Sequence, residues 1–322
     1  MKGFRWLGVL VGFALLAWIL YDADLPAVWK QVESMSWRFG IIFIFYIVIF
    51  GLDTIGWQYT FHPGVLVNVS LAGLFRARLS GEAVNYFTPT AWIGGEPVKA
   101  YLLKKRYGVP TAEGMASVVI AKMTFSFSMF LFIITGLIVT GFTQKIFNPE
   151  LFRWVWLILP VFAVLLTLFF IVQFLKPFQK SVLLLKLVSP ERLHSIGAKV
   201  HEWDQAIKMF YRNSPKDVFL SIGLHFLGWA AGALEVYLIL DFLGTPVNLS
   251  TAWSIEALWV LLKTGAFLIP ASIGASEGFL LLICIGLGID TVLGLALALI
   301  RRAREIGWMG LGLFDLSSGW KK

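Results

Sequence analysis

The chain has 322 residues, of which 58% are hydrophobic and 14% are charged. Soluble domains carry about 25% charged residues, so this composition excludes an ordinary soluble protein and indicates a membrane protein. The formal net charge of +8 does not indicate a nucleic-acid partner, because the cations fall mainly between the apolar runs, where they report topology. The single cysteine, Cys284, excludes an intrachain disulfide and a thiolate metal site.

Six runs are long and apolar enough to predict membrane-crossing helices of roughly 20 residues. The first, residues 6–21, follows Lys2 and Arg5 and has no small-residue cleavage pattern before Asp22 and Asp24. It is therefore expected to be an uncleaved helix and not a signal peptide. The others are residues 39–60, 114–143, 154–175, 218–240 and 291–316, the last of which carries several charges.

Two further segments, residues 71–103 and 251–287, mix apolar residues with charge and break at glycine and proline. Irregular backbone at membrane depth is tolerated only where protein or a wet cavity surrounds it. Each segment therefore predicts a re-entrant helical hairpin. The expected fold is an all-α integral membrane protein of one domain, residues 1–322, with about six transmembrane helices plus two re-entrant hairpins.

The distribution of Lys and Arg predicts the orientation of this layout. With the N-terminus in the cytoplasm, 18 Lys and Arg residues fall on the cytoplasmic side, Arg76, Arg78 and Lys99 among them. Only four fall on the other side: Lys30, Arg38, Lys145 and Arg153. This excess predicts a protein of the cell (inner) membrane with both termini in the cytoplasm.

The longest loop, residues 176–216, contains apolar residues at steps of three and four, which predict an amphipathic helix. They are Leu193, Ile196, Val200, Trp203, Ile207 and Phe210. Two interpretations remain open: the helix lies on anionic lipid headgroups, or it packs against the cytoplasmic face of the protein itself.

An internal repeat relates the two hairpin segments at an offset of 181 residues. Pro89 and Glu96 align with Pro270 and Glu277, and both carboxylates lie seven residues after their proline. The same offset sets Glu82 opposite Lys263, and after a one-residue gap Lys122 meets Arg302. Three predicted crossings separate the two hairpin segments, so the repeats, about residues 39–143 and 218–316, are expected to be inverted. Inverted repeats with broken helices are typical of transporters.

The helix breaks suggest an anion site. Gly94, Gly95 and Gly274 allow close backbone approach and leave amide groups exposed at a half-helix N-terminus, which attracts phosphate. Glu96 and Glu277 would lie in the first turn of the helices that follow. A capping role for these two carboxylates is an equally good interpretation.

Charges inside the predicted crossings are the other candidates. Lys122 lies in an otherwise uncharged run, and Arg301, Arg302, Arg304 and Glu305 cluster in the last one. Each such charge costs about 3 kcal/mol or more in a membrane. At 100° per residue, Arg301, Arg304 and Glu305 share a face and Arg302 lies just beside it, so all should point away from lipid.

Two hypotheses account for these cations. In one, they bind a lipid phosphate. In the other, they only neutralise neighbouring acids, Arg301 with Glu305 and Lys122 with Glu82 or Glu96. Asp53, Glu235 and Glu256 are further acids in apolar context that could bind a coupling proton or simply hydrogen-bond between helices.

No pattern indicates a metal or an organic cofactor. His62, His194, His201 and His225 include no pair with metal-ligand spacing supported by other ligands, and the chain has no P-loop, nucleophile elbow or dinucleotide fingerprint. We therefore predict no cofactor, no metal and no catalytic residues.

Three stretches carry a family resemblance: NYFTPTAWIGGEPVKAYLL, which begins at Asn85, IPASIGASE at residues 269–277, and Arg301-Arg302. Together they resemble the lysylphosphatidylglycerol synthase/flippase transmembrane family over nearly the whole chain. The resemblance implies a flippase without the soluble synthase domain, with a separate lipid-synthesis enzyme as a possible partner. One departure is Ala121-Lys122, where the family often has an acid followed by Arg.

The expected function is therefore movement of a phospholipid or polyprenyl-phosphate-linked lipid between leaflets. The alternatives are a membrane-embedded lipid-modifying transferase and a non-transporting scaffold for envelope-lipid synthesis. The residues expected to contact the lipid are Glu82, Asn85, Pro89, Gly94, Gly95, Glu96, Lys122, Glu256, Lys263, Pro270, Gly274, Glu277, Arg301, Arg302, Arg304 and Glu305.

Overall fold

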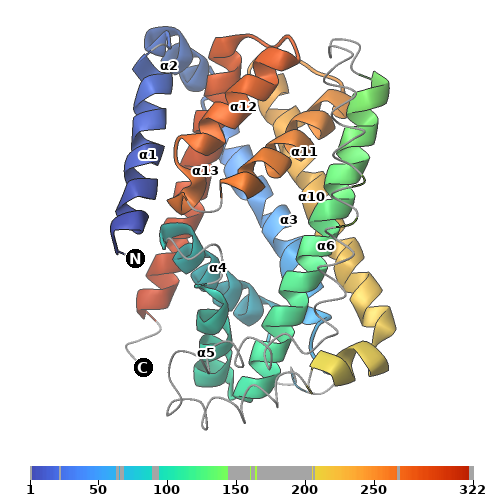
Figure 1. The fold of residues 1–322 in the computed structure, drawn as a ribbon. Helices are drawn as coiled ribbons and strands as arrows, with labels where there is room; N and C mark the ends of the chain where they lie inside the picture. The colour runs from blue at the N-terminus through green and yellow to red at the C-terminus, as the bar shows by residue number, and fades with distance from the viewer. Residues whose placement is uncertain are drawn as a thin grey trace.

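The computed structural model describes residues 2–21, 23–62, 65, 69–88, 94–143, 160, 164, 205, 207–266 and 269–318, and every regular element within them is helical (Figure 1). The helices are α1 (Lys2–Tyr21), α2 (Leu25–Ser34), α3 (Arg38–Gln58), α4 (Leu71–Phe87), α5 (Glu96–Tyr107), α6 (Thr111–Thr143), α10 (Pro215–Phe242), α11 (Leu249–Gly265), the short η1 (Pro270–Ser272), α12 (Ala275–Gly286) and α13 (Thr291–Ser318). The all-α prediction is confirmed for these residues.

Three helices in the described part of the chain are long and apolar enough to cross a membrane: α3, α6 and α10. A fourth candidate is the pair formed by the end of α1 and α2, which bends by 94° between Gly12–Tyr21 and Leu25–Ser34. Helix α13 has 28 residues, and its length of about 42 Å exceeds a hydrocarbon core of about 30 Å. Because of its charged residues, α13 is not among the three helices that are apolar enough to cross. The crossing predicted at residues 154–175 lies outside the described residues, apart from two single positions.

The first hairpin consists of α4 and α5. The Ser70 side chain caps α4 by accepting a hydrogen bond from the Gly73 amide at 3.1 Å. Where the two helices meet, a Cβ on Gly95 would lie 1.9 Å from the carbonyl oxygen of Gly81, so the contact requires glycine. Helix α5 ends at Gly108, whose φ of 72° is a conformation that glycine adopts without strain.

The second hairpin consists of α11, η1 and α12. Its turn contains Gly274 at φ 75° and two non-glycine residues with positive φ, Ala271 at 51° and Ser272 at 49°. Trp259 of α11 donates its indole N–H to Ser276 of α12 and holds the two arms together. Helix α1 packs on this turn through Gly12, where a Cβ would lie 2.8 Å from the carbonyl oxygen of Ile273.

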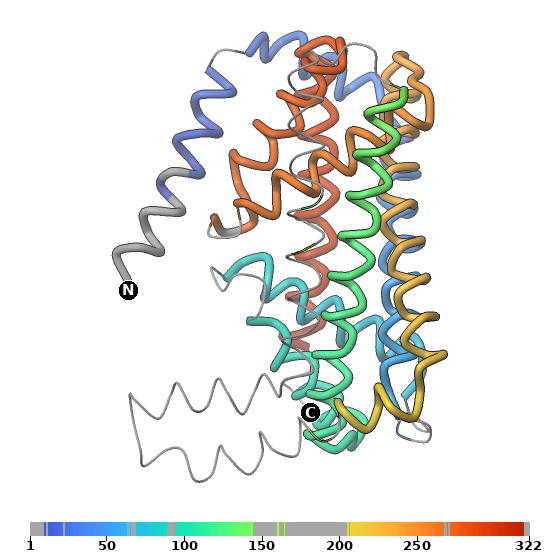
Figure 2. Tube along the Cα trace, turned by 45° about the vertical axis from the view of Figure 1, so that its right-hand side comes forward, coloured from blue at the N-terminus to red at the C-terminus, as the bar shows by residue number. Residues whose placement is uncertain are grey.

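The two hairpins enter the molecule from opposite ends, and their breaks face each other near mid-height (Figures 1 and 2). Around them, α3, α6, α10 and α13 run along the long dimension of the molecule. Helix α10 packs against α3, α6 and α11, while α13 packs against α4, α12 and α2. The hairpins are thereby enclosed on one side by long helices.

The predicted loop helix is described only near its end, where residues 207–213 are helical. There Ile207 and Phe210 are buried against Ala116 and Ile120 of α6. For this part of the loop, the structure favours packing against the protein itself over contact with lipid. Residues 176–204 lie outside the description.

Close contact between α6 and α11 gives a stability prediction. A Cβ on Gly136 of α6 would lie 2.0 Å from the Cβ of Ala257 in α11. Gly136→Ala should therefore lower the free energy of unfolding by about 1–3 kcal/mol, measured as a lower midpoint of thermal inactivation in detergent by size-exclusion chromatography.

Gly51→Ala is the matched control, because nothing lies within 4 Å of a Cβ at that position of α3. It should leave the midpoint unchanged or raise it, since alanine favours a helix over glycine by up to about 1 kcal/mol. Equal midpoints for Gly136→Ala and Gly51→Ala would show that α6 and α11 are not in such close contact.

Candidate functional site

A cavity of about 290 Å³ lies between the two hairpins and the long helices α3, α6, α10 and α13. Apolar and aromatic side chains form much of its wall, among them Trp57, Phe125, Trp229 and Met309. Among the described residues, six acidic side chains line it: Asp53, Glu82, Glu96, Glu235, Glu256 and Glu305. Six basic side chains also line it: Arg78, Lys99, Lys122, Lys263, Arg301 and Arg304. The formal charges of these two sets cancel.

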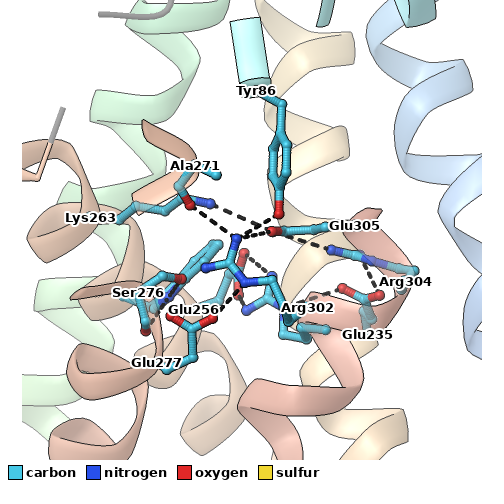
Figure 3. Close-up of polar contacts among 12 residues, drawn as sticks. Tyr86, Glu235, Glu256, Lys263, Ala271, Ser276, Glu277, Arg302, Arg304 and Glu305 are labelled. Carbon is cyan, nitrogen blue, oxygen red and sulfur yellow. Dashed lines mark hydrogen bonds and ion pairs between the residues drawn. The ribbon is translucent and has the colours of Figure 1, made fainter. Parts of the chain in front are cut away.

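Two cations of α13, Arg301 and Arg304, are held by acids from two other helices (Figure 3). Arg301 donates two hydrogen bonds to the carboxylate of Glu256 in α11, at 2.6 and 3.0 Å. Arg304 donates to Glu235 of α10, whose side chain is completely buried. Arg301 also lies 3.6 Å from Glu235, so this one carboxylate serves two guanidinium groups. Both Arg301 and Arg304 are buried, which agrees with the prediction that they face the protein interior.

Arg302 connects the two hairpins. Its Nε donates to Glu277 of α12, and its Nη1 donates to the hydroxyl of Tyr86 at 2.6 Å and to the carbonyl oxygen of Ala271 at 3.0 Å. Tyr86 lies in the last turn of α4 and Ala271 in the turn of the second hairpin. One guanidinium group therefore holds the breaks of both hairpins together, as Figure 3 shows.

The first hairpin has its own ion-pair cluster. Lys99 of α5 donates to Glu82 at 2.6 Å and to Glu96 at 2.8 Å, and Lys122 of α6 lies 3.3 Å from Glu96. Asn85 orders this cluster, since its amide group donates to both carboxylates while its oxygen accepts the Gly95 N–H at 2.6 Å.

The aligned positions of the repeat make the same contact in both halves. Glu96 at the start of α5 pairs with Lys122 of the next helix, and Glu277 in the first turn of α12 pairs with Arg302 of the next helix. Glu277 also accepts the Gly274 N–H at 2.9 Å, so it caps α12 as well. Glu277 therefore has both roles: it caps α12 and it pairs with Arg302.

A third cluster joins α3, α4 and α10. One oxygen of Asp53 accepts from Arg78 at 3.0 Å, and the other lies 2.8 Å from Nδ1 of His225. All three side chains are buried and line the cavity. The sequence indicates Asp53 as an acid in an apolar run, but it does not predict the contact of Asp53 with His225, 172 positions away.

A further ion-pair cluster lies outside the cavity lining, near the end of α13. Asp315 accepts hydrogen bonds from Arg76 at 2.6 Å, from Arg106 at 2.8 Å and from Ser80 at 2.8 Å. These partners belong to both arms of the first hairpin, so the cluster fixes that hairpin to α13.

The structure places most of the expected site residues at the cavity. Those that line it are Glu82, Asn85, Glu96, Lys122, Glu256, Lys263, Arg301, Arg304 and Glu305. Arg302 and Glu277 lie beside it and pair with each other. Gly94, Gly95, Pro270 and Gly274 lie at the hairpin breaks, whereas Pro89 is outside the described residues.

Arg78 and Lys99, which the charge count assigns to the cytoplasmic side, lie in helices and line the cavity. One detail of the sequence-based interpretation is wrong. The expected pairing of Arg301 with Glu305 is replaced by Arg301 with Glu256. Glu305 instead lies 3.6 Å from Lys263 and 3.4 Å from Arg302.

Glu235 gives the second prediction. Glu235→Gln removes the charge that faces Arg304 and Arg301 while keeping the side-chain shape. Removal of one partner of a buried ion pair costs about 3–5 kcal/mol, so the thermal midpoint in detergent should fall markedly. Asp241→Asn is the control, because this acid is exposed near the end of the same helix; its effect should be within about 0.5 kcal/mol. Similar midpoints for the two variants would contradict the role of Glu235 as a buried counter-ion.

Comparison with known proteins gives the family. The chain matches the model for the lysylphosphatidylglycerol synthase TM region over residues 5–312. It is 24% identical over 312 residues to a UPF0104 membrane protein of Methanothermobacter thermautotrophicus, an alignment that covers 93% of this chain and 89% of that protein. The name of that relative specifies no activity, and no solved structure matches the chain. Because the family match extends over nearly the whole sequence, this protein belongs to the lysylphosphatidylglycerol synthase transmembrane-region family.

Proposed function

We propose that this protein is a lipid flippase that moves a phospholipid or a polyprenyl-phosphate-linked lipid between leaflets. The headgroup passes through the charged cavity while the acyl or prenyl tails stay in the lipid. The observation that carries the proposal is the contact of Arg302 with both hairpin breaks, since it places a cation where the two halves of the molecule meet beside the cavity.

The proposal includes a membrane topology. The two hairpins are re-entrant and belong to inverted repeats, α13 crosses the membrane with its charged face toward the cavity, and about six crossings leave both termini in the cytoplasm of a cell with this protein in its inner membrane. The opposite entry of the two hairpins supports this arrangement. Transporters of this architecture bind substrate near the midplane, between the repeats.

Some buried hydrogen-bond donors at the site have no partner. Within the described part of the chain, Arg302 Nη2, Arg304 Nε and the hydroxyl of Ser272 are buried and have no hydrogen-bond partner. An unsatisfied buried donor costs about 1–3 kcal/mol. A phosphate oxygen would satisfy such donors, and arginine binds phosphate through paired N–H groups.

Lys122 and Lys263 supply the more loosely held charges. Their ammonium groups lie 3.3 Å from Glu96 and 3.6 Å from Glu305, longer than the other lysine pairs of the cavity. Lys122 is also the most exposed of the basic side chains in the cavity, at 35%. A phosphate can therefore displace one of these carboxylates at lower cost than it could separate Arg301 from Glu256.

Reconstituted liposomes test the function. Trace amounts of acyl-chain-labelled phosphatidylglycerol, or of a fluorescent polyprenyl phosphate, report leaflet exchange through quenching by a membrane-impermeant reductant. Arg302→Gln should slow exchange about tenfold or more, because a charge-assisted hydrogen bond contributes about 1.5–3 kcal/mol. Glu277→Gln should also slow exchange, since it removes the ion pair between Arg302 and α12.

Arg38→Gln is the matched control. Arg38 is exposed, donates to the carbonyl oxygen of Phe242 and does not line the cavity, so its replacement should leave exchange within about twofold. Absence of exchange with correctly inserted wild-type protein and every probe would refute the flippase. A new covalent lipid product in the same vesicles would indicate the transferase, and neither exchange nor product would indicate the non-transporting scaffold. Exchange that is unaffected by both Arg302→Gln and Glu277→Gln would refute the role proposed for this ion pair.

A further inference from the structure

His225 occupies an unusual position on the cavity wall. Its side chain is 2% exposed, and its ring lies flat against Gly56 of α3, where a Cβ would be 2.9–3.1 Å from three ring atoms. Phe125 packs edge-on against the ring, with centroids 5.4 Å apart. These contacts fix the orientation of the imidazole.

The partner of His225 determines which ring nitrogen carries the proton. Asp53 is bound by the guanidinium of Arg78 at 3.0 Å, which favours the ionised carboxylate. Nδ1 therefore donates its hydrogen to Asp53 over 2.8 Å. In the neutral ring this leaves the lone pair on Nε2, which is buried and has no hydrogen-bond partner among the described residues. His225 can thus accept one proton at Nε2 without losing its bond to Asp53.

The charged groups around His225 come from every surrounding helix. The nearest are Asp53 of α3, Arg78 of α4 and Lys99 of α5. Further along the same cavity, the charges are already paired: Lys122 of α6 with Glu96, Glu256 of α11 with Arg301, and Glu235 of α10 with Arg304. With no cargo present, burial and the charges of Arg78 and Lys99 favour the neutral ring, while the Asp53 carboxylate favours the charged one.

The charge balance of the cavity links this histidine to transport. The six acids and six bases that line it cancel, so an anionic headgroup brings in a negative charge that no fixed group offsets. Such a charge is expensive in a low-dielectric cavity. Among the cavity-lining residues of the described chain, His225 is the one histidine, and histidine is the side chain that ordinarily titrates near neutral pH.

We propose that His225 is a proton-binding site that couples the movement of an anionic phospholipid headgroup to the movement of one proton. The inference rests on the proposed flippase function and adds its energy source. Nε2 takes the proton from water on the side toward which the cavity is open, and the phosphate and the imidazolium then coexist in a cavity without net charge. After the cavity opens to the other side, headgroup and proton leave together.

Co-movement of an anion and a proton is electrically neutral, and this gives a thermodynamic test. With the membrane potential clamped by potassium and valinomycin, a gradient of about one pH unit across liposomes should shift the steady-state leaflet ratio of labelled phosphatidylglycerol up to about tenfold toward the alkaline side. Labelled phosphatidylcholine, whose headgroup is zwitterionic, should show no such shift.

His225→Gln should return the phosphatidylglycerol ratio to about one under the same gradient, because glutamine bonds to Asp53 but does not titrate. His62→Gln should keep the shift, since His62 lies outside the cavity lining and contacts Phe210 instead. A shift that persists in His225→Gln would overturn the assignment.

The wild-type measurement does not depend on the folding of any variant. If phosphatidylglycerol exchanges but its leaflet ratio does not respond to the pH gradient, proton coupling is overturned while the flippase function stands. Absence of exchange for every probe would overturn the flippase and the coupling with it.

Discussion

Charge buried among apolar helices is the constraint on which this structure depends. Each isolated charge there costs about 3 kcal/mol or more, and the described part of the cavity contains twelve. All twelve take part in ion pairs, and most of those pairs connect different helices. The pairs therefore decide which helices must meet: α13 with α10 and α11, the first hairpin with α6, and α3 with α4.

The sequence predicts the broad architecture well for a physical reason. Apolar runs, breaks at glycine and proline, and the 181-residue offset are all local patterns, and they predict α3, α6, α10 and both hairpins. The offset also aligns Glu96 with Glu277 and Lys122 with Arg302, and in the structure the acid and the base within each repeat are in contact. A charged residue in an apolar run indicates a buried site, because its charge is costly in lipid unless the protein encloses it.

The remaining parts of the site depend on contacts between distant segments. His225 looks like a lone histidine in an apolar helix until α3 brings Asp53 to its Nδ1. Lys99 and Arg78 count only as cytoplasmic charges in the sequence, and their place on the cavity wall depends on the packing of α5 against α6 and of α4 against α13. Tyr86 carries no sequence signal, yet its hydroxyl is one of the two hairpin groups that Arg302 reaches through Nη1. No periodicity within one helix contains this information.

The ion pairs of α13 also bear on how the protein is made. Arg301, Arg302 and Arg304 would resist entering the bilayer alone, because a helix with three arginines near its centre is a poor substrate for insertion. Their acidic partners, Glu235, Glu256 and Glu277, all precede them in the chain. Since synthesis proceeds from the N-terminus, these acids leave the ribosome before α13 does. In the proposed topology, in which α13 crosses the membrane, its insertion therefore depends on acidic partners that earlier helices supply.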